Sequence, residues 1–227
     1  QLCKDAEREG RLPKNVSIVR LYHTNVPGER LVNATQFNGC RTLNAEDIAQ
    51  AETVLQQQLV QVNEFLRREV PGFEHIRVRA SADTLGIRES RRIRGLYELT
   101  AEDLIAGRRF DDAVVNGANF CIDIHNPSGG GQSETEGCPH RAQPYDIPMR
   151  ALQPSGIENL VLSGRCISGS HRAHASYRVM NIAMAIGQAA GCMASEAADR
   201  RCRVSELEPQ AVRQRLVRQG CTLRGEN

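Results

Sequence analysis

Apolar positions follow a helical period over the longest regular stretch of the chain. From Asn44 they recur every three or four residues until Pro71-Gly72 ends the run, at Ile48, Ala51, Leu55, Leu59, Val62 and Leu66. This spacing predicts a long amphipathic helix, with Asn44 as its N-cap and Asp47 three residues on, as in a capping box. We expect the apolar stripe to pack in a core rather than to form a partner surface.

A period of two, or a short continuous apolar run, predicts strands elsewhere. Residues 16–22 and 30–35 flank a turn at Pro27-Gly28 and are expected to form a hairpin or two neighbouring strands. Further strands are expected over residues 75–80, 87–99, 119–125 and 158–165. The last of these is a continuous apolar run that ends in glycine, as a strand buried on both faces of a parallel sheet would.

Other helices are expected in the second half of the chain. A short one begins near Thr100, with acidic residues in its first turn, and the final one runs from Pro209 to Gly220. Between them, a helix from about Ser176 to Asp199 is rich in alanine and glycine, so it can approach another backbone or a flat cofactor closely. Its polar residues exclude a membrane span: Asn181, Gln188, Ser195 and Glu196. These elements predict an α/β protein.

The segment from Asn126 to Gly137 is rich in glycine and polar residues and is expected to be a surface loop. Cys138-Pro139-His140 follows this loop. Together with His125, Cys138 and His140 are the candidate ligands of a metal ion. Their spacing is not typical of a metal site, and no CxxC pair occurs in the chain. We therefore expect free thiols and no metal.

Composition narrows the classes of function. The chain has 227 residues, and its 29 lysines and arginines nearly balance 27 acidic residues, so that the net charge is 29 − 27 = +2. Dedicated nucleic-acid binders and polybasic membrane binders need a clustered excess of basic residues. The charge balance therefore argues against both classes and leaves an ordinary globular protein; it does not define the oligomeric state or the compartment.

Alternation predicts that charged residues lie on an apolar strand face. In a regular strand, Glu89 and Arg91 share one face with Ile87 and Ile93, whereas Arg88 lies on the other face. A buried carboxylate and guanidinium must form an ion pair or contact a bound ligand, because an unpaired buried charge costs several kcal/mol. Two interpretations stay open here, a structural ion pair and a contact with a substrate or cofactor.

A second strand brings possible proton-transfer groups together. Cys121, Asp123 and His125 lie on one face of the strand predicted over residues 119–125. A carboxylate two residues from an imidazole can orient it for proton transfer. The same pattern is also typical of the solvent-exposed face of an amphipathic strand. Both interpretations, a proton-transfer pair and a solvated strand face, stay open.

The segment from Gly164 to Arg178 joins the predicted parallel strand to the helix rich in small residues. Ligands of open α/β sheets bind at the carboxyl ends of strands, and a helix N-terminus offers free N–H groups and positive potential. Such a junction suits an anion or an electron-rich heterocycle. A helix directed at the pyrimidine end of a flavin would stabilise the negative charge that develops there on reduction.

The order of several short motifs resembles the C-terminal half of FAD-dependent oxidoreductases, in particular the glutathione reductase-like flavoproteins. The resemblance covers roughly residues 10 to 220. The motifs are Pro71-Gly72-Phe73-Glu74, Gly86 to Ile93, Phe110-Asp111-Asp112-Ala113, Ile122-Asp123-Ile124-His125, Tyr145-Asp146-Ile147-Pro148, Asn159 to Arg165 and Gly187-Gln188-Ala189-Ala190-Gly191.

The resemblance implies FAD as cofactor and hydride transfer with a small organic substrate. It implies a substrate-facing cap domain over residues 1–150 and a returning part of a Rossmann-like FAD domain over residues 151–227. The implied flavin contacts are Gly164, Arg165, Ser168, Arg178, Val179 and Met180; the substrate-side residues are Arg88, Glu89, Arg91 and Tyr145; and the proton-transfer candidates are His125, His171 and Asp123.

The sequence departs from the family pattern in two respects. Arg165 follows the glycine after the return strand, where many related flavoproteins have an acidic residue, and no GxGxxG motif follows a strand. We therefore expect the 227 residues to be a portion of a longer enzyme that binds FAD weakly or not at all by itself. A non-catalytic binding or scaffold module derived from the same fold is the alternative.

Overall fold

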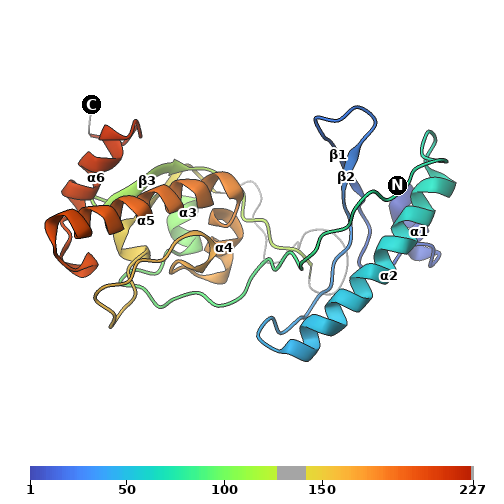
Figure 1. The fold of residues 1–227 in the computed structure, drawn as a ribbon, viewed down its shortest axis with the longest axis horizontal. Coiled ribbons are helices and arrows are strands. Elements are labelled where there is room, and N and C mark those ends of the chain that lie inside the picture. Colours follow the sequence, from blue (N-terminus) through green and yellow to red (C-terminus); the bar gives the residue numbers. More distant parts are fainter. Residues whose placement is uncertain (127–141, 226–227) are drawn as a thin grey trace. The chain divides into compact units, whose positions relative to one another are not determined.

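A computed structural model describes residues 1–126 and 142–225, so the expected surface loop and Cys138 to His140 lie outside the described residues. The chain forms two compact units (Figure 1). Unit 1 comprises Gln1–Ser90 and His125–Ser133, and unit 2 comprises Arg91–Ile124 and Glu134–Asn227. The functional division expected near residue 150 stays a prediction.

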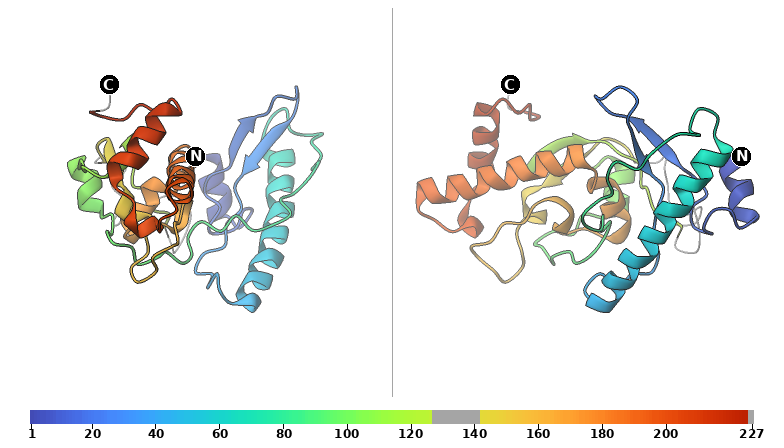
Figure 2. Two further views of the ribbon diagram at one scale, coloured as in Figure 1. Left: turned by 60° about the vertical axis from the view of Figure 1, so that its left-hand side comes forward. Right: turned by 45° about the vertical axis from the view of Figure 1, so that its right-hand side comes forward.

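Unit 1 consists of α1 (Leu2–Arg8), the strands β1 (Arg20–His23) and β2 (Arg30–Asn33), and the long helix α2 (Ala45–Glu69). The strands pair antiparallel, with Arg20 opposite Asn33, which confirms the predicted hairpin. Figure 2 shows this hairpin in blue and α2 in cyan from two further sides. The turn between the strands contains Gly28 at φ +80°, a conformation that glycine adopts without strain.

Helix α2 begins and ends where the sequence predicts. The side chain of Asn44 accepts a hydrogen bond from the Asp47 amide at 2.9 Å, and the helix stops before Pro71-Gly72. The Asp47 carboxylate does not close the capping box but binds Arg41, whose hydrogen bonds lower the pKa of Asp47 to about 2. The buried face of α2 packs on α1 and the following loop in a core of Ala6, Leu12, Val16, Val62, Phe65 and Leu66.

A cluster of amide side chains lies beside this core. Gln58 of α2 is only 5% exposed, although it lies mostly off the predicted apolar stripe. Its Oε1 accepts from the Gln36 amide at 2.9 Å, while its Nε2 donates to the Gln36 carbonyl at 3.0 Å and to Asn15 Oδ1 at 3.2 Å. These bonds attach α2 to the segments before and after the hairpin.

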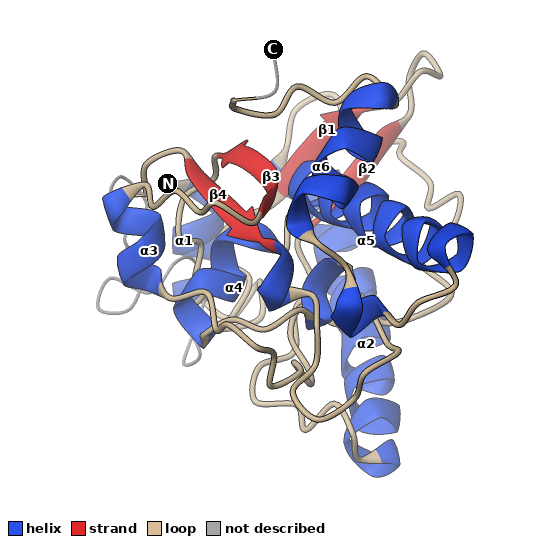
Figure 3. Cartoon of the chain, turned by 90° about the vertical axis from the view of Figure 1, so that its left-hand side faces the viewer, coloured by secondary structure: helices blue, strands red, loops and turns tan. Residues whose placement is uncertain are grey.

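Unit 2 packs two short strands against helices (Figure 3). Strand β3 (Ala113–Ala118) pairs antiparallel with β4 (Tyr145–Pro148), with two register shifts. The remaining elements are α3 (Ala101–Ala106), η1 (Met149–Ala151), η2 (Gly164–Cys166), α4 (His171–Tyr177), α5 (Met180–Arg200), η3 (Val204–Glu206) and α6 (Pro209–Arg218). The mixture of helices and two small antiparallel sheets confirms the α/β class.

The three helices expected in this region are confirmed. Helix α3 has Thr100 as N-cap in a complete capping box with Asp103, and α6 begins at Pro209. The helix expected from about Ser176 to Asp199 is α5, which begins four residues later at Met180, whereas the separate short helix α4 before it was not expected. Within the described residues, none of the helices combines the length and the apolar character that crossing a membrane requires.

Four of the predicted strands are wrong: within the described residues, 75–80, 87–99, 119–125 and 158–165 form no strand. Part of the second segment is extended but bonds to loops, through the amides of Ile93 to Cys166, Leu96 to Gln153 and Leu99 to Ser168. The third segment keeps its alternation, because Ile122 and Ile124 are buried between half-buried neighbours, but the strand itself is β3, directly before it.

The fourth segment carries the largest correction. Residues 158–165 were expected to form a strand buried on both faces, yet Leu160 is 42% exposed. The Leu162 amide bonds to the Leu152 carbonyl, outside any sheet. The physical reason is that a parallel strand needs a neighbour to complete its hydrogen bonds, and both described sheets are antiparallel pairs made by other segments.

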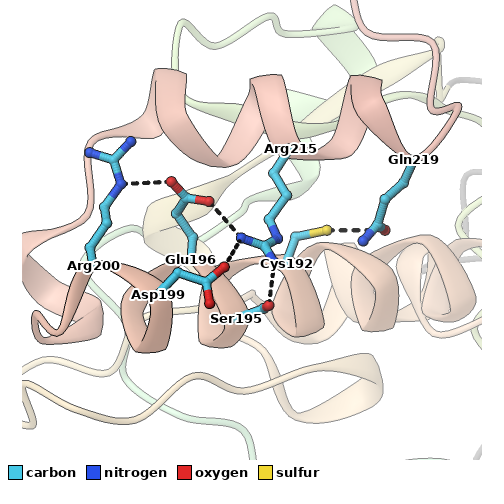
Figure 4. Close-up of polar contacts among 7 residues, drawn as sticks. All are labelled: Cys192, Ser195, Glu196, Asp199, Arg200, Arg215 and Gln219. Atoms are coloured by element: carbon cyan, nitrogen blue, oxygen red, sulfur yellow. Dashed lines mark hydrogen bonds and ion pairs between the residues drawn. The ribbon is translucent and has the colours of Figure 1, made fainter.

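A network of polar side chains attaches α6 to α5 (Figure 4). Arg215 of α6 donates to Glu196 at 2.9 Å, to Asp199 at 2.7 Å and to Ser195 Oγ at 2.5 Å. Arg200 donates to the other oxygen of Glu196 at 2.6 Å. These hydrogen bonds hold the pKa of Glu196 below its ordinary value, Arg215 being the largest cause.

Candidate functional site around helices α4 and α5

The loop before α4 is pressed against that helix. The Ser170 side chain caps α4 by accepting from the Ala173 amide at 3.2 Å, and His171 is the exposed first residue of the helix. A Cβ on Gly169 would lie 2.6 Å from a ring carbon of Tyr177, so only glycine fits there. The Tyr177 hydroxyl donates to the Ile167 carbonyl at 3.2 Å, which fixes the loop from the helix side.

An ion pair joins two of the residues that the sequence singled out. Arg178, at the end of α4, donates through Nη2 to Asp123 Oδ2 at 2.9 Å and to the Asp123 carbonyl at 3.0 Å. The two side chains are only 13% and 17% exposed. Because water screens such a partly buried pair less than a surface pair, it holds the guanidinium in place directly before α5.

Helix α5 begins without a side-chain cap. Its N-cap is Val179, and the amide groups of its first turn lie at the positive end of a 21-residue helix. Met180 and Met184 on the first turns are 84% and 74% exposed. The exposed face continues with Gly187, Gly191 and Ala194, and no charged residue occurs between Met180 and Ser195. The start of α5 thus combines amide donors with a smooth uncharged surface.

Tyr145 is held inside unit 2 by a chain of hydrogen bonds. Ser176 Oγ donates to the Phe120 carbonyl at 2.6 Å, so it accepts from the Tyr145 hydroxyl at 2.9 Å. Tyr145 is fully buried, and burial raises the pKa of its hydroxyl far above the ordinary value. The phenol is therefore neutral at physiological pH and ties β4 to α4.

The family model described as FAD dependent oxidoreductase matches residues 4–216 of the chain. The chain belongs to the FAD-dependent oxidoreductase family. No curated protein and no solved structure matches it. The glutathione reductase-like subtype stays a prediction. As a member of the family, this oxidoreductase has FAD as its implied cofactor, in agreement with the resemblance seen in the motifs.

The donor set at the start of α5 fits the ring end of FAD. The isoalloxazine is a flat aromatic system with carbonyl oxygens and ring nitrogens along one edge. Amide groups of the first turn and the Arg178 guanidinium donate hydrogen bonds, whereas Met180, Met184 and Gly187 offer exposed uncharged surface. A Cβ on Gly187 or Gly191 would meet no atom within 4 Å, so this face is open to a flat ligand.

The other predicted flavin contacts lie in the loop before α4. Gly164 has φ +67° and begins η2, and Arg165 beside it is exposed. Ser168 is 2% exposed and packs against Gly95, where an added Cβ would lie 2.6 Å from the Ser168 Cβ. For these residues, contact with FAD stays a prediction.

The predicted substrate-side and proton-transfer residues are divided between the two units. In unit 1, Arg88 is exposed, and Glu89 and His125 are half-buried. Arg91 begins unit 2 and is exposed, so the prediction that it shares a buried face with Ile87 is wrong. The reason is that the segment carries no strand ladder, and its side chains do not keep a regular alternation past Ser90. The roles of these residues stay predictions.

Sequence reasoning missed two polar residues that organise this region. Ser176 connects Tyr145 to Phe120, and Arg92 donates through Nε to the Gly169 carbonyl at 2.8 Å. Arg92 is half-buried. No local signal identifies either contact, because their partners lie 56 and 77 residues away. No cluster of three or more metal-binding side chains occurs in the described part of the chain.

Proposed function

We propose that this FAD-dependent oxidoreductase transfers a hydride between the flavin and a small organic substrate, and that the 227 residues contribute the C-terminal portion of the flavin site. The observation that carries the proposal is the start of α5, whose first-turn amides directly follow Arg178, a residue held by Asp123, and precede an exposed, uncharged helix face. FAD, when bound, supplies the hydride chemistry, and the protein supplies orientation, electrostatics and a proton.

Arg178 and the first turn of α5 would stabilise negative charge at the pyrimidine edge of the flavin. A helix N-terminus and a fixed guanidinium both favour an anion, and their effect is largest where water is excluded. Asp123 would act as a positioning residue, since its carboxylate already holds Arg178. Gly164, Arg165 and Ser168 are proposed to border the cofactor from the preceding loop, and Val179 and Met180 from the helix start.

Proton transfer is assigned to a histidine. His171 is exposed at the start of α4, where an imidazole can reach a ligand, and His125 is the other candidate. Arg88, Glu89 and Arg91 are proposed to face the substrate from the cap. For Tyr145, substrate contact stays a prediction, and the bond to Ser176 gives its hydroxyl a positioning role.

The proposal that the chain is one portion of the enzyme is supported by two uncovered surfaces. The uncharged face of α5 is exposed, and residues 158–165, which have the composition of a buried parallel strand, are largely exposed with Leu160 among them. Both would be covered if further segments completed the FAD domain over residues 151–227. A non-catalytic scaffold remains the second candidate, because a fold can persist without its chemistry.

Flavin retention tests this proposal. The product of the complete coding region should purify with FAD and lose its visible flavin absorbance when a substrate reduces it, whereas residues 1–227 alone should bind FAD weakly or not at all. If the product of the complete coding region contained no flavin, the non-catalytic scaffold would be favoured. Tight stoichiometric FAD binding by residues 1–227 would overturn the proposal that these residues are one portion of the enzyme.

Arg178 provides the residue-level test in the complete product. Arg178→Gln should weaken FAD binding roughly tenfold, the size expected for one charge-assisted hydrogen bond, and should lower the flavin reduction potential. Arg178→Lys should recover part of both effects. Arg218→Gln, at an exposed position near the end of α6, is the matched control and should change neither. A reduction potential unchanged in Arg178→Gln would reject the electrostatic role.

A further inference from the structure

An open pocket of about 450 Å³ lies on the surface of unit 2 and shares no residue with the proposed flavin site. This volume is within the usual range for small-molecule sites, roughly 300–1,000 Å³. Its lining comes from the segment between α3 and β3, from η1 and from the start of α6. The residues are Arg108, Arg109, Phe110, Asp111, Asp112, Arg150 and Pro209.

The backbone of this rim is fixed at both ends. The Arg108 carbonyl accepts from the Asp146 amide at 3.0 Å, and the Asp112 carbonyl accepts from the Met149 amide at 2.8 Å. The segment 108–112 therefore lies bonded along β4 rather than hanging free as a loop. A backbone segment held in this way loses little conformational entropy when a ligand binds.

Each of the three arginines in the lining is anchored by a carboxylate that lies deeper than the arginine itself. The arginine side chains are 55%, 44% and 47% exposed, whereas their carboxylate partners are 4%, 1% and 11% exposed. All three closest contacts measure 2.9 Å, for Arg108 with Asp103, Arg109 with Asp146 and Arg150 with Asp112. The guanidinium groups thus face outward with N–H donors beyond those that the carboxylates occupy.

Aromatic rings lie beside two of these groups. The Arg108 guanidinium lies 5.2 Å from the Phe110 ring centroid, and that of Arg150 lies 5.3 Å from the Tyr97 ring centroid. The two rings meet edge to face at 5.0 Å. Contact with a ring restricts the movement of a guanidinium group, so that its remaining donors are partly preorganised for a planar or tetrahedral oxyanion.

The outward position of the guanidinium groups, and not a net charge, favours an anion. Arg108, Arg109, Arg150 and the neighbouring Arg224 balance Asp103, Asp111, Asp112 and Asp146, which gives 4 − 4 = 0. Asp103 and Asp146 lie behind the arginines, and Asp146 is shared with Arg224 at 3.4 Å. Pro209 is the first residue of α6, so the positive end of that helix adds to the field. Among the lining residues, exposed Asp111 is the acidic side chain that opposes an incoming anion, and exposed Glu208, the N-cap residue of α6, weakens the field of that helix end.

We propose that this pocket binds a small molecule through a phosphate or carboxylate group. The anion contacts the outward donors of Arg108, Arg109 and Arg150, and the rest of the ligand lies against Phe110 and Pro209. The two ligand classes share the oxyanion that the guanidinium groups recognise.

Titration of the protein with inorganic pyrophosphate and, separately, with succinate tests this site, followed by isothermal calorimetry and by amide chemical shifts. We expect saturable binding with at least one probe, and the probe that binds identifies the class. Arg109→Gln should weaken that binding roughly tenfold, with partial recovery in Arg109→Lys. Asp111→Asn should tighten it roughly two- to threefold by removing the opposing charge, an effect that added salt reduces.

Arg218→Gln, at the opposite end of α6 from Pro209, is the matched control and should leave the affinity unchanged. Arg109→Gln removes the ion pair with Asp146 and could unfold the protein. Asp111 is exposed, so Asp111→Asn should fold normally and still tests the site. The site is rejected if neither probe saturates, if Arg218→Gln weakens binding as much as Arg109→Gln, or if Asp111→Asn leaves the affinity unchanged. None of these outcomes depends on flavin binding.

Discussion

Unit 1 and unit 2 are built by different kinds of interaction. Unit 1 has a core of six buried apolar residues around α2, and its hairpin is largely exposed, with Leu31 62% accessible. Unit 2 buries apolar residues from every one of its α-helices and both strands in one continuous core. Burial of apolar area is the main favourable contribution to folding. Unit 1 must therefore depend more on each single core residue and on the amide cluster of Gln58.

Among the variants that test this difference between the units, Phe65→Ala should cause the largest loss of stability. The side chain is 4% exposed and is the largest in the core of unit 1, so its removal should cost about 4 kcal/mol and leave a cavity that this core cannot fill. Amide hydrogen exchange should show loss of protection throughout unit 1 while α5 and β3 stay protected. The matched change Ile147→Ala in unit 2 should cost about 3 kcal/mol and leave unit 2 folded. Equal loss of protection in both units would contradict the comparison.

Gln58→Ala should have a smaller effect that is specific to unit 1. It removes the partner of the Gln36 amide and of two acceptors inside the unit, and an unsatisfied buried polar group costs about 1–3 kcal/mol. Urea unfolding should show this loss as a lower midpoint. Gln57→Ala, one residue away on the exposed side of α2, should change stability by less than about 0.5 kcal/mol. If both variants behave alike, the amide cluster contributes nothing.

The pH dependence of unit 2 should give the smallest effect. The pKa of Glu196 is lowered in the folded state, so its contribution is complete above the unfolded pKa and is lost as the pH falls through the lowered folded value. We expect about 1 kcal/mol or less, because Arg200 is half exposed and Arg215 is one-fifth exposed. Unfolding midpoints between about pH 3 and pH 7 should fall less steeply in Glu196→Gln than in the natural sequence. Parallel curves would show that the network does not contribute.

Local signals in the sequence predicted the helices well. Asn44 and Thr100 are residues that cap helices through their own side chains, and Pro209 fits the first turn, so each boundary is decided within a few residues. The short helix α4, His171–Tyr177, was not predicted. Helix α1 was not predicted, since only Ala6 of it is buried.

Strands and the site could be predicted only in part. Alternation indicates which side chains share a face, as Ile122 and Ile124 do, but a ladder also needs a partner that the local pattern does not identify. The pairing of Ala113 with Pro148 joins residues far apart in sequence. In the same way, Asp123 and Arg178 were each singled out from local motifs, while their contact across 55 residues was visible only in the structure.

The distribution of cysteines gives each unit its own chemical reporter. The described cysteines are free thiols, with Cys3 and Cys40 in unit 1 and Cys121, Cys166, Cys192, Cys202 and Cys221 in unit 2. Burial raises the pKa of the Cys121 and Cys192 thiols, so few are thiolates at neutral pH and alkylation is slow until the surrounding structure opens. Rates of thiol labelling, resolved by peptide, therefore measure the opening of each unit in the natural protein without an introduced probe.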